Sequence, residues 1–137
     1  ATEVVLRVRQ AVLRVFPEDA QSDVEIRETQ AIGYSHNPII IVEAILRQQQ
    51  CDAALDSLIS RMSVENRRFI VDTLNQRVDE NCVLFIRIDK QAAFNGMIQL
   101  ATGPDIISLR IHIRNKGRCP SQELLQSLRE RFIQTGL

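Results

Sequence analysis

Alternating basic residues are the feature of this sequence that points most directly to a chemistry. Arg110, His112 and Arg114 occupy every second position, with Ile111 and Ile113 between them. Successive side chains of a β-strand point to opposite faces, so the basic ones would share a face at intervals of about 6.6 Å. Guanidinium groups in such a row pair with phosphate oxygens and displace counterions from a nucleic acid. The RNA-contacting residues that we predict from this pattern and its surroundings are Arg27, Arg87, Arg110, Arg114, Lys116 and Arg118.

Two loops add candidates to this set. Residues 33–38 read Gly-Tyr-Ser-His-Asn-Pro, in which a glycine turn exposes backbone N–H groups and either Tyr34 or His36 offers a ring that can stack on a base. Residues 89–94 place Lys90 and Gln91 after a strand, and we expect Phe94 of the same segment to be a core residue. His36 and Lys90 therefore join the predicted RNA-binding residues.

Each of these patterns also has an ordinary structural explanation. A sheet with one solvated face shows alternating charge whatever its function, and Glu25, Glu43 and Asp89 are available to neutralise the arginines. Loops are commonly built from Gly, Ser, Asn and Pro because these residues form turns. Only the clustering of the basic side chains in space distinguishes the two explanations.

Motifs of catalysis and of metal binding are missing from the sequence. There are two histidines, with no His-x-His or His-x-x-x-His pair, no Gly-x-Ser-x-Gly elbow and no glycine-rich phosphate loop. We therefore predict no catalytic residue and no metal ligand. An enzyme of unrecognised type, centred on His36 with Asp89 or Lys90, remains as an alternative.

Composition limits the class of protein. The 137 residues contain 17 Lys or Arg and 17 Asp or Glu, which predicts a single domain over residues 1–137 and excludes a polybasic, histone-like binder. No apolar run is long enough to span a membrane. Every basic residue except Lys90 and Lys116 is an arginine. Three cysteines more than thirty residues apart predict free thiols and a reducing, cytoplasmic location.

The elements that would position these residues begin with an amphipathic helix over residues 2–16, capped by Thr2 and ended by Pro17. Strands over 23–32 and 38–47 follow and form a hairpin. The second strand is apolar on both faces, which predicts a place inside the sheet.

A helix pair over residues 52–62 and 64–78 comes next, with Ser63 as the N-cap of the second helix. Residues 82–89 alternate as a strand, and 90–96 form a connection that holds at most one helical turn.

The C-terminal third predicts a second hairpin and a last helix. Strands over 97–101 and 106–115 flank the turn 102–105, and the helix covers residues 120–136. The order is α-β-β-α-α-β-β-β-α. It predicts an α+β fold of two layers, with an antiparallel or mixed sheet of about five strands and helices packed on one side.

Residues 33–40 and 89–94 together carry a resemblance to a known family. The sequence resembles an archaeal family of small proteins described as predicted RNA-binding proteins or exosome subunits, thought to share the fold of the 5S-rRNA-binding large-subunit ribosomal protein. The resemblance implies an α+β domain, a cytoplasmic RNA-related role and no cofactor. The positions that match the family's pattern are Gly33, His36, Asn37, Pro38, Asp89, Lys90, Gln91 and Ala92.

The leading prediction is a non-catalytic RNA-binding or RNA-processing accessory protein, and the resemblance implies an association with the exosome. Its partners would be RNA and a multiprotein RNA-processing complex, without a membrane. The runner-up is a protein-interaction module of a larger assembly, in which the same arginines meet acidic side chains of a partner protein.

Overall fold

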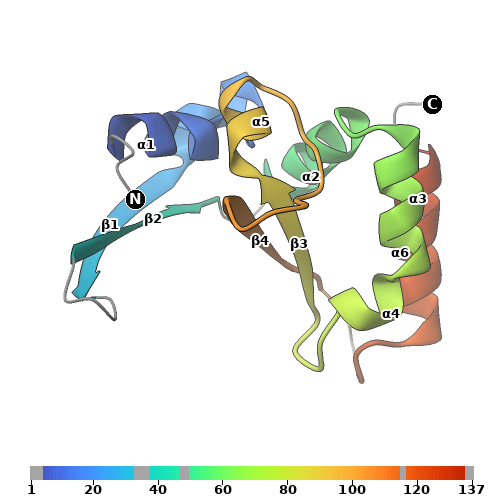
Figure 1. Ribbon diagram of the computed structural model, residues 1–137. Coiled ribbons are helices and arrows are strands. Elements are labelled where there is room, and N and C mark those ends of the chain that lie inside the picture. The colour runs from blue at the N-terminus through green and yellow to red at the C-terminus, as the bar shows by residue number, and fades with distance from the viewer. Residues whose placement is uncertain (1–4, 33–37, 47–49, 115–116, 135–137) are drawn as a thin grey trace.

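A computed structural model describes residues 5–32, 38–46, 50–114 and 117–134 (Figure 1). None of the helices within those ranges is both long and apolar enough to cross a membrane. The elements are, in chain order, α1 (Val5–Leu13), the 3-10 helix η1 (Glu18–Asp23), β1 (Glu25–Ile32), β2 (Pro38–Ile45), α2 (Gln50–Ser60), α3 (Val64–Asp72), α4 (Leu74–Arg77), β3 (Val83–Asp89), α5 (Lys90–Phe94), β4 (Ile106–His112) and α6 (Gln122–Gln134).

The strands form two antiparallel ribbons of two strands each. In the first, Glu25 of β1 lies opposite Ile45 of β2, and in the second, Val83 of β3 lies opposite His112 of β4. Figure 1 shows the β1–β2 ribbon on the left under α1, with β3 and β4 near the centre and α3, α4 and α6 on the right. The predicted α+β class and the first hairpin are confirmed, whereas the single sheet of about five strands is wrong.

Residues 97–101 explain part of the difference between the predicted sheet of about five strands and the two ribbons observed. Ile88 of β3 bridges Leu100 on one edge and pairs with Ile107 of β4 on the other, so β3 separates the two segments predicted to form the second hairpin. The backbone N–H of Asp89 donates to the Gln99 carbonyl (2.8 Å) beside that bridge. A single bridge does not make a strand. The predicted hairpin is therefore wrong, because the turn sequence at 102–105 does not establish that the segments on its two sides pair with each other.

The apolar run of β2 also predicted a position inside the sheet. Among the described residues β2 pairs with β1 alone, so this prediction is wrong. The α1 helix packs against this ribbon, and Arg9 of α1 makes an ion pair with Glu28 of β1 (3.3 Å).

The hydrophobic core lies between the β3–β4 ribbon and the helices. Leu84, Ile86 and Ile88 alternate along β3 and are buried, so the opposite face of that strand is left to solvent. Ser63 caps α3, as predicted, by accepting a hydrogen bond from the Asn66 N–H (3.1 Å). Residues outside the strands that belong to the core include Ala11, Val15, Leu55, Leu58, Ile59, Ile70, Leu74, Ala93, Leu124, Leu125, Leu128 and Phe132.

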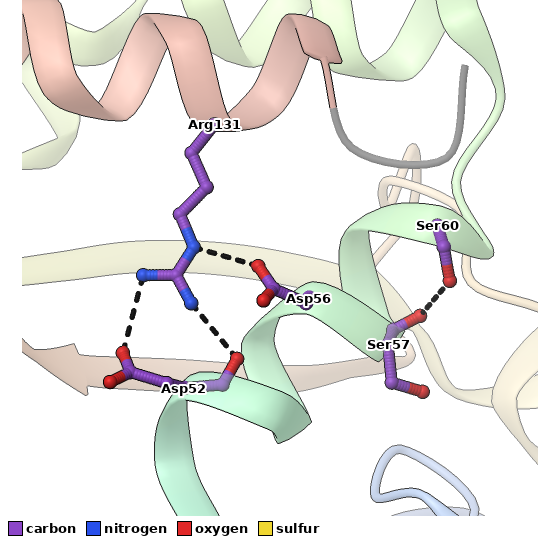
Figure 2. A network of polar contacts seen from close by, with 5 residues as sticks. All are labelled: Asp52, Asp56, Ser57, Ser60 and Arg131. Carbon is purple, nitrogen blue, oxygen red and sulfur yellow. Dashed lines mark hydrogen bonds and ion pairs between the residues drawn. The ribbon is translucent and has the colours of Figure 1, made fainter.

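An arginine of the last helix ties α6 to α2 (Figure 2). The Nε of Arg131 donates to Asp56 Oδ1 (2.8 Å), its Nη1 donates to Asp52 Oδ1 (3.3 Å), and its Nη2 donates to the Asp52 carbonyl (2.9 Å). One planar guanidinium thus contacts two successive turns of α2. The network joins helices that are far apart in the chain.

We expect Arg131→Ala to lower the free energy of unfolding by about 1 kcal/mol, because both carboxylates are exposed and the backbone carbonyl loses one partner. Urea unfolding measures this change. The control is Arg129→Ala, because the Arg129 side chain bonds weakly to Gln126 of its own helix (3.5 Å). Equal stability changes for the two variants would contradict the interhelical role.

Cys82 and Cys119 correct a prediction made from spacing. They form a disulfide, although they are 37 residues apart in the sequence, whereas Cys51 is free as predicted. Close sequence spacing reveals metal and redox motifs, but it does not show which distant segments the fold brings together. The disulfide joins the turn before β3 to the segment before α6.

Candidate nucleic-acid interface

The exposed face of the β3–β4 ribbon carries three arginines. Opposite residues of an antiparallel pair share a face, and Arg110 lies opposite Phe85 while Arg87 lies opposite Ser108. His112 and Arg114 continue the β4 row beyond Arg110, and all of these side chains are exposed. We call Arg87, Arg110, His112 and Arg114 the basic face.

Carboxylates are absent from the middle of this ribbon. Between Val83 and Ile88, and between Ile106 and Arg114, the sequence contains no Asp or Glu. In the part of the chain that the structure describes, Arg87, Arg110 and Arg114 form no ion pair. The neutral net charge of the chain thus coexists with a local surface on which none of the described carboxylates forms an ion pair with the three arginines.

Two of the predicted residues lie elsewhere and have partners. Arg27 belongs to β1, in the other ribbon, where its Nε contacts Glu25 Oε1 (3.0 Å) and its backbone pairs with Glu43. Lys90 is largely buried and contacts Asp105 Oδ1 (2.5 Å). Neither residue joins the basic face.

Part of the predicted binding set and of the family pattern lies outside the described residues, whereas residues 89–94 are described in full. His36 and Lys116 from the predicted binding set, and Gly33 and Asn37 from the family pattern, lie outside the described residues. Pro38 begins β2. Arg118 is exposed on the segment next to Cys119, whose disulfide holds it near the start of β3.

Residues 89–92 have a structural role. Asp89 accepts a hydrogen bond from the Ala92 N–H (2.8 Å) and so caps α5, the helical turn predicted here. Gln91 Nε2 donates to Asp105 Oδ2 (2.9 Å). Hydrogen bonds from Lys90 and then from Gln91 lower the pKa of the Asp105 carboxyl.

This lowered pKa predicts a pH-dependent stability. A carboxyl with a depressed folded-state pKa stabilises the fold above its unfolded pKa of about 3.9, and the contribution disappears as the pH falls through the folded value. We expect Asp105→Asn to be less stable than the parent at neutral pH, with the difference shrinking below pH of about 4. Urea unfolding at both pH values measures it. A difference that persists in acid would contradict the assignment.

Other arginines hold the fold together. Arg67 is 5% exposed and its Nη2 donates to the Ser60 carbonyl (3.2 Å). Arg61 donates to the carbonyls of Arg14 (2.6 Å) and Val15 at the end of α1, and burial lowers its pKa. These roles explain part of the arginine content without reference to a ligand.

Three residues beside the basic face were missed from the sequence. Phe85 is exposed on β3, and Phe69 is exposed on α3 under the guanidinium of Arg77. Phe69 does not belong to the apolar residues that its helix turns toward the core. An aromatic residue outside that set was the sequence signal for an exposed ring. Among the described residues no three His, Cys, Asp or Glu side chains gather where they could hold a metal ion.

A family model described as RNA binding matches residues 1–113 of the chain. The chain belongs to this RNA-binding family. A relative in the family is the RNA-binding protein PAB1135 of Pyrococcus abyssi, which is 34% identical over 116 residues, or 83% of this chain and 75% of that protein. The uncharacterized protein MJ0213 of Methanocaldococcus jannaschii is 29% identical over 112 residues, or 78% of this chain and 73% of that protein.

Solved structures support the fold of this RNA-binding family. The DUF54 protein AF2318 of Archaeoglobus fulgidus is similar with a TM-score of 0.76 and 28% identity, covering 96% of this chain and 91% of that one. Mth689 of Methanothermobacter thermautotrophicus, also a DUF54 protein, is similar with a TM-score of 0.72 and 26% identity, covering 96% and 90%. The resemblance to an archaeal family inferred from the sequence is confirmed.

Proposed function

We propose that the protein is a non-catalytic RNA-binding protein whose basic face contacts the sugar-phosphate backbone. The observation that carries this proposal is the row of Arg87, Arg110 and Arg114, exposed on one ribbon and without an ion-pair partner among the described residues. Arginines that the fold leaves exposed and unneutralised retain their donors for phosphate oxygens.

The site favours binding over chemistry. Asp89 and Lys90, the partners suggested for a catalytic His36, cap α5 and pair with Asp105 respectively. Within residues 83–88 and 106–114 the basic face contains guanidinium groups, the His112 imidazole and the Ser108 hydroxyl, but no carboxylate. Such a surface attracts phosphates, and no carboxylate within it orients the His112 imidazole for general acid–base catalysis.

The proposal includes a finer role, in which the protein serves RNA processing as an accessory of a multiprotein complex such as the exosome. The resemblance to predicted exosome subunits supports this role. An accessory that binds RNA without cleaving it would need a surface of the kind formed by the basic face.

Affinity for RNA measured against salt concentration tests the proposal. Engagement of four or five phosphates of a single strand predicts a slope of about −3 for the logarithm of affinity against the logarithm of salt. Fluorescence anisotropy of a labelled RNA oligonucleotide measures it. The absence of binding at low salt, or an affinity that does not change with salt, would reject RNA binding by the basic face and favour a protein-interaction module.

A further inference from the structure

Two phenylalanine rings are exposed beside the basic face. Phe69 on α3 is 55% exposed and Phe85 on β3 is 38% exposed. The other three phenylalanines behave as core residues, since Phe132 is fully buried and Phe16 and Phe94 pack against the core. Large exposed aromatic side chains that lie close together mark an interaction surface more often than isolated ones do.

Each exposed ring has a guanidinium above it. The Cζ of Arg77 lies 5.6 Å from the centroid of Phe69, and the Cζ of Arg110 lies 6.0 Å from the centroid of Phe85. Arg77 also donates through Nη1 to the carbonyl of Phe85 (3.4 Å), which connects the two pairs. Phe69, Arg77, Phe85 and Arg110 are therefore linked by contacts from α3 to β4, with Arg77 meeting Phe85 at its backbone carbonyl, and we call these four residues the aromatic stripe.

The alternation of ring and guanidinium suits one kind of ligand. Aromatic rings and guanidinium planes both stack on nucleobases, and the arginine charge attracts the adjoining phosphates. In a duplex the faces of the bases are covered by their neighbours in the stack, so only unpaired bases can reach a ring on the protein surface.

We propose that the aromatic stripe stacks unpaired bases, so that the ligand is single-stranded RNA. This inference rests on the proposed function, because Arg87 and Arg114 of the basic face then hold the phosphates on either side of the stacked bases. An acidic protein partner would use the same arginines without needing exposed rings.

The sequence contains no tryptophan, which permits a direct test. Phe85→Trp keeps an aromatic ring on the stripe and makes it the only indole in the protein. We expect its fluorescence to be quenched by an oligoadenylate of about 15 nucleotides, a length near the upper site size of single-strand binders. We expect little quenching by a perfect RNA duplex of equal length, or by an abasic chain that retains the phosphates.

A loss-of-ring variant gives the size of the effect. Phe85→Leu keeps an apolar side chain on the ribbon but removes the π-face, and we expect it to bind the oligoadenylate roughly five- to a hundredfold more weakly. Its affinity for the abasic chain should not change. The matched control is Ile133→Ala, because Ile133 is 49% exposed on α6 and belongs neither to the stripe nor to the basic face. Circular dichroism and thermal unfolding verify that each variant is folded.

The outcomes separate this inference from the proposed function. Tight, salt-dependent RNA binding with no tryptophan quenching and no effect of Phe85→Leu would overturn base stacking while leaving RNA binding in place. Equal quenching by duplex and single strand would overturn the preference for unpaired bases. Failure of the unmodified protein to bind any of these RNAs would overturn both proposals.

Discussion

Replacing Arg110 and Arg114 together with alanine is expected to weaken RNA binding by on the order of fiftyfold at about 50 mM salt. For single-stranded RNA, each lost phosphate contact reduces the steepness of the slope of log affinity against log salt by about 0.7. Losing two contacts should therefore change this slope from about −3 to about −1.6. Both side chains are exposed and make no ion pair among the described residues, so their removal should leave stability nearly unchanged. Anisotropy titrations over a range of salt concentrations measure both quantities.

A charge-matched variant controls for the loss of positive charge in general. Arg9→Ala with Arg27→Ala also removes two arginines, but these pair with Glu28 and Glu25 on the β1–β2 ribbon. Removing them should leave the affinity and the salt slope close to those of the parent. If the two double variants weaken binding equally, the contact depends on net charge alone and the basic face has no special role.

Breaking the disulfide is expected to have the largest effect on stability. Cys82 and Cys119 close a loop across a separation of 37 residues, and the chain-entropy model assigns such a cross-link about 4 kcal/mol. Cys82→Ala with Cys119→Ala should therefore unfold at a clearly lower urea concentration than the oxidised parent. Reduction of the parent should reproduce most of this change.

Thiol titration verifies the cross-link independently. The unreduced protein, denatured in urea, should show one reactive thiol, that of Cys51, and the reduced protein should show three. Three reactive thiols before reduction would contradict the disulfide. Cys51→Ser serves as the matched control, because it removes an exposed thiol that takes no part in the cross-link.

Local patterns predicted the elements well where one chain segment determines its own structure. The alternation of Leu84, Ile86 and Ile88 with Phe85 and Arg87 predicted both faces of β3. The same argument applied to β4 placed Arg110 and Arg114 on one exposed face. Caps at Ser63 and the helical turn after Asp89 also follow from local hydrogen bonding.

Pairing between distant segments was not predictable from these patterns. The stretch 97–101 meets β3 instead of β4, and Cys82 meets Cys119 across 37 residues. Lys90 was assigned to the RNA-binding set because it follows a strand, and that local pattern does not reveal its ion pair with Asp105, 15 positions later in the sequence. Each of these errors concerns a tertiary contact, which spacing along the chain does not encode.

The aromatic stripe was missed for a related reason. Phe69 lies outside the inward positions of its helix, but Phe85 looked like an ordinary residue of an alternating strand. Only the packing of α4 against β3 lets Arg77 contact both the Phe69 ring and the Phe85 backbone carbonyl. The likeness to the 5S-rRNA-binding ribosomal protein stays a prediction.

Backbone amide chemical shifts, followed by NMR as a short single-stranded RNA is added, test most directly whether the exposed side of the β3–β4 ribbon meets RNA. We predict that the largest shifts fall within residues 83–89 and 106–114, with smaller ones near Phe69 and Arg77. The account is contradicted if the protein binds the RNA while those amides stay unchanged and the shifts are confined to β1, β2 and α1.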